Sequence, residues 1–137
     1  MKIGLFQFAP VRGRPDTNAA TLESALRSAD CDLLVAPELA TSGYLYLDRA
    51  ELASVSESVP DGPTSARLLR ACRETGRSIV FGLVERDGEK IYNSAALLPP
   101  TGCSALYRKA HLFDTETLVF DRAGASNDLA EVAGAKI

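Results

Sequence analysis

Residues 33–36 form an uninterrupted apolar run, Leu-Leu-Val-Ala, that stops at Pro37 and Glu38. An apolar run without alternation is typical of a strand that is covered on both faces. Pro37 favours an extended backbone at Ala36 and cannot donate a hydrogen bond to a sheet, so the strand is predicted to end there. The run therefore constrains the fold to layers packed on both sides of a sheet, and it places Glu38 at the edge of that sheet.

Two amphipathic helices are expected, one before this strand and one after it. The first starts near Asp16 or Thr17, either of which can cap a helix, and the apolar residues that follow recur with helical spacing. The second opens at Pro63 and closes at Gly76, because proline is favoured at the first helical position and glycine just past the last one.

Most of the remaining chain has the composition of strands and turns. Asp87-Gly88 lies between two apolar segments and predicts a hairpin. The strands are expected at residues 2–8, 78–85, 91–98 and 104–107, with a C-terminal hairpin at 129–132 and 136–137. This order, βαβ followed by a helix and further strands, predicts an α/β fold with a mixed sheet and helices packed on one face.

Composition excludes several classes of function. The net charge of −3 and the absence of a basic cluster argue against nucleic acid as a partner. The longest apolar stretch, residues 79–84, is too short to span a bilayer, so no membrane association is expected. Three cysteines without paired spacing argue against disulfides and indicate a cytoplasmic protein. His111 is the single histidine and cannot form a metal site alone. The sequence also contains neither a P-loop nor a dinucleotide-binding glycine pattern, so neither metal nor cofactor is expected.

Glu38 and Lys109 each follow an apolar run and are the leading candidates for chemistry. A carboxylate just past a buried strand is expected to be partly withdrawn from water, which suits it to proton transfer near neutral pH. A lysine held beside it could stabilise a developing oxyanion. On position alone, however, a solvated loop acid and a surface lysine are the commoner interpretations.

Five ordered segments favour the catalytic interpretation. Together they resemble the nitrilase, or carbon–nitrogen hydrolase, family in order and spacing over essentially the whole chain. The segments are Lys2-Ile-Gly-Leu-Phe-Gln-Phe-Ala-Pro10, Asp32-Leu-Leu-Val-Ala-Pro-Glu38 with Thr41-Ser-Gly-Tyr44, Gly82-Leu-Val-Glu-Arg86, Ile91-Tyr-Asn-Ser94 and Tyr107-Arg-Lys-Ala-His-Leu112.

The resemblance implies roles for individual residues. Glu38 corresponds to the general base, Lys109 to the oxyanion-stabilising lysine, and Glu116 to a second glutamate that positions the base or the substrate, with Asp114 as a competitor for that third role. Tyr44 and His111 are expected to line the substrate pocket. Asn93 is interpreted as structural or pocket-lining, and not as catalytic.

The resemblance also implies a four-layer α-β-β-α sandwich and a cysteine nucleophile on a strand that starts near residues 136–137. Cys31, Cys72 and Cys103 do not occupy that place and are interpreted as core cysteines. Residues 1–137 are therefore expected to be the N-terminal portion of a single hydrolase domain, apparently truncated and inactive alone. The implied substrate is a small amide, N-carbamoyl compound or nitrile, and the implied assembly is a homo-oligomer.

Two other interpretations remain open at this point. The chain could be a non-catalytic binding or scaffold module derived from the nitrilase fold. It could also be an unrelated doubly wound α/β protein.

Overall fold

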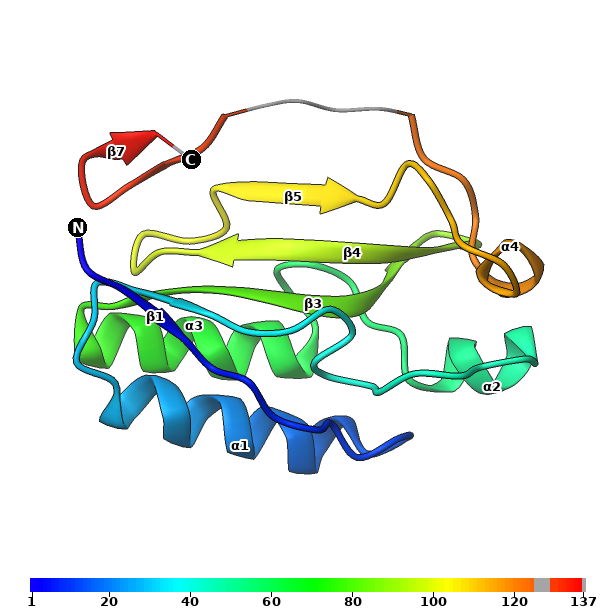
Figure 1. Cartoon of the computed structure of the whole chain (residues 1–137), viewed down its shortest axis with the longest axis horizontal. Coiled ribbons are helices and arrows are strands. Elements are labelled where there is room, and N and C mark those ends of the chain that lie inside the picture. Colours follow the sequence, from blue (N-terminus) through cyan, green and yellow to red (C-terminus); the bar gives the residue numbers. More distant parts are fainter. Residues whose placement is uncertain (125–128, 137) are drawn as a thin grey trace.

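The structure, a computed structural model that describes residues 1–124 and 129–136, is built on a five-stranded mixed sheet (Figure 1). Neighbouring strands follow the order β1-β2-β3-β4-β5; β1, β2 and β3 are parallel, and the β3–β4 and β4–β5 pairs are antiparallel. These strands are β1 (Ile3–Leu5), β2 (Leu33–Val35), β3 (Ser78–Asp87), β4 (Lys90–Leu98) and β5 (Ala105–Arg108).

Two long helices pack side by side against one face of the sheet, and they lie below it in Figure 1. They are α1 (Pro15–Ser28) and α3 (Pro63–Thr75), whereas the short helices α2 (Arg49–Ser54) and α4 (Glu116–Val119) lie together at one end of the sheet. A small hairpin, β6 (Glu131–Val132) and β7 (Ala135–Lys136), completes the described chain. The α/β fold with a mixed sheet and helices on one face is therefore as predicted.

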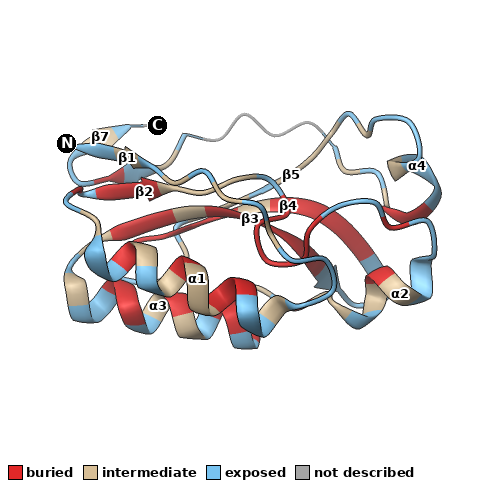
Figure 2. Cartoon of the chain, turned by 60° about the horizontal axis from the view of Figure 1, so that its bottom comes forward, coloured by how far each residue is buried: buried red, intermediate tan, exposed pale blue. Residues whose placement is uncertain are grey.

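Strand β2 is covered on both faces, as its continuous apolar run predicted. Leu34 is 4% exposed and joins the core beneath α1 and α3, whereas Leu33 is 2% exposed and packs on the other side with Leu97 and Val132. Val132 comes from β6, so the C-terminal hairpin covers part of the face that the helices leave free. Figure 2 shows the buried residues concentrated in the sheet and on the inner sides of the helices.

The helix boundaries follow the sequence signals with one correction. Helix α3 begins at Pro63 and ends before Gly76, which adopts the left-handed conformation with φ of 71°. Helix α1 begins at Pro15, and its N-cap residue is Arg14, whose side chain makes no capping hydrogen bond. The prediction of a cap at Asp16 or Thr17 was therefore wrong, because the proline occupies the first helical position and puts the N-cap two residues before Asp16.

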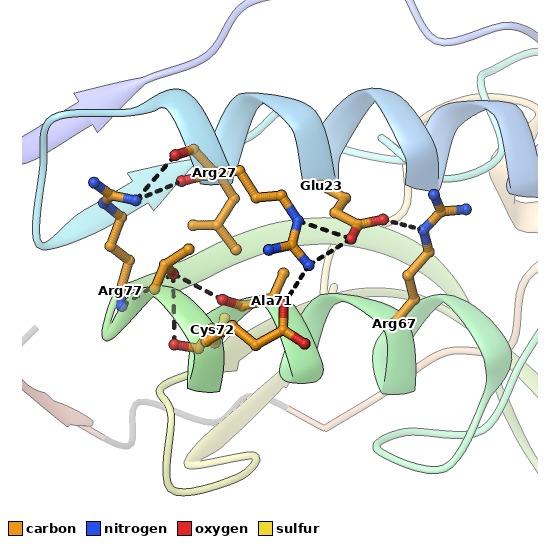
Figure 3. Close-up of polar contacts among 9 residues, drawn as sticks. Glu23, Arg27, Arg67, Ala71, Cys72 and Arg77 are labelled. Atoms are coloured by element: carbon orange, nitrogen blue, oxygen red, sulfur yellow. Dashed lines mark hydrogen bonds and ion pairs between the residues drawn. The ribbon is translucent and has the colours of Figure 1, made fainter.

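Ion pairs connect the exposed sides of α1 and α3 (Figure 3). Glu23 accepts hydrogen bonds from Arg27 (2.9 Å) and Arg67 (2.5 Å), and Arg27 also reaches Glu74 at 2.6 Å. Arg77 donates to the carbonyl oxygen of Arg27 near the end of α1. Because the arginines are 38–40% exposed, each pair adds only about 0.2–1 kcal/mol, and buried apolar contacts hold the two helices.

Smaller differences from prediction lie at the turns. Asp87 pairs with Lys90, so the hairpin turns at Gly88 and Glu89, one residue later than expected; Gly88 supplies the positive φ. Helix α4 was not predicted, and strand β1 is shorter than residues 2–8. Both strands of the C-terminal hairpin are present, although its last expected residue, Ile137, lies outside the described residues. Among the described residues, no helix is long and apolar enough to cross a membrane.

Candidate active site

Glu38 and Lys109 lie at the same edge of the sheet because of its topology. Two antiparallel steps separate β3 from β5, so β5 runs in the same direction as β2 and β3. Glu38 follows the end of β2 after Ala36 and Pro37, and Lys109 directly follows the end of β5. Residues at the carboxyl ends of strands that run in one direction meet at one edge, so two residues 71 positions apart come within bonding distance.

Three charged side chains meet in one hydrogen-bonded cluster, Glu38, Lys109 and Glu116. The Nζ atom of Lys109 lies 2.8 Å from Oε1 of Glu38, and 3.0 and 2.9 Å from Oε1 and Oε2 of Glu116. Glu116 is the first residue of α4, and its Oε2 also accepts a hydrogen bond from the backbone N–H of Phe113 at 2.7 Å. The three residues predicted from the sequence are thus brought together.

Asn93 is a fourth member of this cluster. Its Nδ2 donates to Oε1 of Glu38 at 2.7 Å and to Oε1 of Glu116 at 3.0 Å. The sequence analysis interpreted Asn93 as structural or pocket-lining and did not assign these contacts. The available signal was its position in the Ile91-Tyr-Asn-Ser94 segment, where strand alternation makes Asn93 and Ser94 face opposite sides of the sheet.

Close backbone packing fixes the segment that carries Glu38. A Cβ atom at Gly82 would lie only 2.4 Å from the backbone N of Leu39 and 2.6 Å from Cα of Glu38, so this strand residue has to be glycine for the loop to approach. The N–H of Gly82 donates to the carbonyl of Pro37 at 3.0 Å. The hydroxyl of Tyr44 donates to the carbonyl of Glu38 at 2.8 Å.

Arg108 fixes the end of β5 from the opposite side of the sheet. Its guanidinium donates to both carboxylate oxygens of Glu85, which is 2% exposed, and lies 4.2 Å from the ring centroid of Tyr92. The backbone N–H of Lys109 donates to the carbonyl of Asn93 at 2.8 Å. With Arg108 held on the helix side, the next residue is directed to the other side, toward Glu38.

Burial and charge act in opposite directions on the cluster. Burial disfavours the charged ammonium of Lys109, but its bonds to Glu38 and Glu116 outweigh that effect and raise its pKa. Burial likewise opposes charge on Glu116, yet the Phe113 N–H, Lys109 and Asn93 together hold its pKa below the usual value. Both groups are therefore charged near neutral pH.

Glu38 is the most open member of the cluster. Its side chain is 42% exposed, compared with 26% for Lys109 and 20% for Glu116. The sequence analysis expected a carboxylate partly withdrawn from water, and a side chain that is 42% exposed is partly withdrawn. Pro37 does end the strand as predicted, but the following loop turns the side chain of Glu38 toward an open cleft.

Two clefts meet at Glu38 and Lys109. The first, of about 340 Å³, lies on the sheet face opposite α1 and α3, and the second, of about 360 Å³, lies between loops near α4. The floor of the first is mostly apolar and includes Val80, Ala95 and Tyr107, whereas the second is lined by Tyr44, Asp114 and Glu116 among others. The cluster is thus accessible to a small molecule from both clefts.

The other predicted site residues lie at different distances from the cluster of Glu38, Lys109 and Glu116. Tyr44 lines the second cleft, and burial together with the charge of Glu38 raises the pKa of its hydroxyl. Asp114 also lines that cleft, but Glu116, and not Asp114, contacts Lys109. His111 is exposed and is not among the described residues that line the two clefts, so the structure does not bring it into the cluster.

None of the three cysteines is among the described residues that line the two clefts. Cys72 lies on the buried side of α3, where its thiol donates to the carbonyl of Leu98, and burial raises its pKa to about 12. Cys31 and Cys103 precede β2 and β5, at the ends of those strands opposite to Glu38 and Lys109. In the part of the chain that the structure describes, no group of three potential metal ligands occurs.

Comparison with known proteins gives a consistent result. A sequence model of the family described as carbon-nitrogen hydrolase matches residues 2–136. The chain is 36% identical over 124 residues to a nitrilase of Pyrococcus abyssi, covering 88% of this chain and 47% of that relative. It is 38% identical over 121 residues to an (R)-stereoselective amidase of a Pseudomonas species, covering 85% and 42% of the two chains.

A solved structure of a CN-hydrolase superfamily protein from Xanthomonas campestris has the same fold. Its TM-score to this chain is 0.84 at 24% sequence identity, with 99% of this chain and 51% of that chain covered. The chain thus spans about half the length of the proteins that it matches.

Proposed function

Because the chain belongs to the carbon–nitrogen hydrolase family, we propose that Glu38, Lys109 and Glu116 form the acid–base and oxyanion part of an amidase-type active site. Residues 1–137 would form the N-terminal portion of a single hydrolase domain. The observation that carries this proposal is the cluster itself, in which Lys109 lies within 3.0 Å of both carboxylates at the meeting point of two clefts.

The proposed nucleophile is a cysteine other than Cys31, Cys72 and Cys103, supplied from the part of the relatives' length that this chain does not span. Glu38, as the base, takes the thiol proton, and the thiolate attacks the carbon of the amide. Charge moves to the carbonyl oxygen, where the ammonium of Lys109 stabilises it. Glu38 returns its proton to the nitrogen, and ammonia leaves as the thioester forms. Glu38 then takes a proton from water, which attacks the thioester carbon; the carbon–sulfur bond breaks, the acid leaves and the proton on Glu38 returns to the cysteine sulfur.

The proposed substrates are a small amide, an N-carbamoyl compound or a nitrile. The relatives named a nitrilase and an (R)-stereoselective amidase support this class of carbon–nitrogen bond. Every step uses the side chains of the site and water, so neither cofactor nor metal is part of the proposal.

The experiment that tests the proposal measures ammonia release from a panel of amides, N-carbamoyl compounds and nitriles. The 137-residue chain alone is expected to release none, and the protein purified from its native source is expected to turn over one of these classes and to lose activity in Glu38→Gln. If the 137-residue chain hydrolyses an amide after replacement of all three cysteines, but not as Glu38→Gln, the thiol mechanism is wrong.

Self-association is a second part of the proposal. Ile3 and Leu5 are 51% and 82% exposed, and Tyr107 is 45% exposed. Alternation along β1 and β5 puts these side chains on the sheet face opposite α1 and α3. Exposed apolar side chains on a sheet face favour association, so sedimentation is expected to show a dimer or larger species. A concentration-independent monomer would contradict this.

A further inference from the structure

Asn93 joins the two carboxylates of the cluster, and we infer that it is a positioning residue that fixes the separation and direction of Glu38 and Glu116. Its single Nδ2 atom lies 2.7 Å from Oε1 of Glu38 and 3.0 Å from Oε1 of Glu116. A primary amide carries two N–H bonds on that nitrogen, so each carboxylate receives one. The catalytic meaning of this contact rests on the proposed function, whereas the contact itself does not.

The place of Asn93 in the sheet makes it a rigid support. It lies in β4, which has a strand on each side, and it is paired with Val84 and only 3% exposed. Its carbonyl oxygen also accepts the backbone N–H of Lys109. One residue of a central strand therefore contacts all three charged residues of the cluster. Sites held by residues on strands are set more accurately than sites held by loops.

Glu38 in particular needs such a support, because packing fixes its backbone but leaves its side chain open. Glu38 lies in a loop with its side chain 42% exposed, and a glutamate has three side-chain torsions to fix. Lys109 also bridges the two acids, but it has four flexible side-chain torsions of its own. The short side chain of Asn93 is the stiffest of the four, so it defines where the two carboxylate oxygens point.

Charge explains why an amide suits this position. Two carboxylates share one lysine, and a third carboxylate beside them would add repulsion. A neutral donor stabilises both anions without adding charge or competing for Lys109. Without it, the Glu116 carboxylate is expected to titrate at higher pH, and Glu38 is expected to sample several side-chain conformations.

The test uses Asn93→Ala and the nearly isosteric Asn93→Asp, with NMR of 13C-labelled glutamate that follows the carboxyl group of Glu116 and the side chain of Glu38. Loss of the Asn93 donor should raise the titration midpoint of Glu116 by about half to one pH unit in Asn93→Ala, and further in Asn93→Asp. The three-bond scalar couplings along the Glu38 side chain should change from the values of a single staggered rotamer to values averaged over several rotamers. If Asn93→Ala does not fold, Asn93→Ser, which keeps one hydroxyl donor, takes its place.

Ser94→Ala is the matched control, because it removes a buried donor to a different carboxylate from the neighbouring position of the same strand. Its hydroxyl donates to Glu85 at 2.6 Å on the opposite face of the sheet. This variant should leave the midpoint of Glu116 and the couplings of Glu38 unchanged. Folded Asn93 variants in which the Glu116 midpoint shifts by less than about 0.2 pH unit and the Glu38 couplings do not change would overturn the positioning role.

Turnover separates this inference from the proposed function. In an active protein, Asn93→Ala should lower kcat about 10- to 100-fold with little change in KM, because the base is misdirected and substrate contacts remain. If the titration and couplings change as expected but no form of the protein hydrolyses an amide, the positioning role stands and the proposed function fails.

Discussion

Gly82→Ala tests whether close packing against β3 holds the segment that carries Glu38. The added Cβ would lie 2.4 Å from the backbone N of Leu39 and 2.6 Å from Cα of Glu38. Both neighbours are backbone atoms, so no flexible side chain can move aside. Opening the 2.4 Å contact to the roughly 3.4 Å at which ordinary van der Waals contact begins requires a retreat of about 1 Å.

That retreat breaks the bonds that attach the segment to β3. The bond from Gly82 N to Pro37 O is 3.0 Å long and the bond from Thr41 N to Gly82 O is 3.3 Å, and both would exceed hydrogen-bonding distance. Two lost bonds cost about 2 kcal/mol, and residual overpacking costs about 1–2 kcal/mol more. Alanine recovers about 0.5–1 kcal/mol over glycine in a strand, so the expected loss in unfolding free energy is about 2–3.5 kcal/mol.

Urea unfolding monitored by circular dichroism measures this loss, with Gly124→Ala as the control. A Cβ at Gly124 meets no atom within 4 Å, and its φ is not positive, so Gly124→Ala should change the unfolding free energy by less than about 0.5 kcal/mol. In an active protein, Gly82→Ala should also lower kcat about 100-fold, since Glu38 moves by about 1 Å. A Gly82→Ala protein as stable as Gly124→Ala would refute the reasoning.

Three further predictions concern a buried thiol, the acid–base cluster and a helix terminus. Burial raises the pKa of Cys72 to about 12, so only about one thiol in ten thousand is a thiolate at pH 8. Iodoacetamide should therefore label Cys72 only after unfolding. Stoichiometric labelling of Cys72 in the native protein would contradict its burial. Because the pKa of Glu116 is lowered in the folded state, this group stabilises the fold fully above its unfolded pKa of about 4.3, and the stabilisation is lost as pH falls through the folded pKa. Because the pKa of Lys109 is raised, its stabilisation is present below about pH 10.4 and is lost as pH rises through the folded pKa. Urea unfolding across pH should therefore show stability falling at both acid and alkaline pH, and Glu116→Gln should weaken the fall at acid pH. Glu57 is 9% exposed and accepts hydrogen bonds from the backbone N–H groups of Thr64 and Ser65 at the start of α3. Glu57→Gln should therefore lower the unfolding free energy measured in urea by about 1–2 kcal/mol. An unchanged unfolding free energy would refute this role of Glu57.

The sequence predicted those parts of the fold that depend on local patterns. The apolar run before Pro37 located β2 and its coverage on both faces, and Pro63 and Gly76 bounded α3 correctly. The meeting of Glu38 and Lys109 followed from the family resemblance, and the structure explains it by the common direction of β2 and β5.

The sequence could not predict features that depend on contacts between distant segments. The donor role of Asn93 depends on the β3–β4 register and on the place of α4, a four-residue helix too short to leave a periodic signal. The need for glycine at position 82 arises from the Glu38 loop, 44 residues earlier in the chain. The openness of Glu38 depends on how that loop turns after Pro37, which proline alone does not determine.

The bonds of Lys109 have a consequence for which oxygen atoms it can hold. An ammonium group has three N–H bonds, and here they face one oxygen of Glu38 and both oxygens of Glu116. Any further oxygen has to draw a donor away from an anion. A neutral carbonyl oxygen is the weaker acceptor and loses that competition, whereas a negatively charged oxygen meets a carboxylate on equal terms. Under the proposed function, Lys109 would therefore select oxygen atoms by their charge and give little to a resting substrate, which is the condition under which binding energy increases a rate.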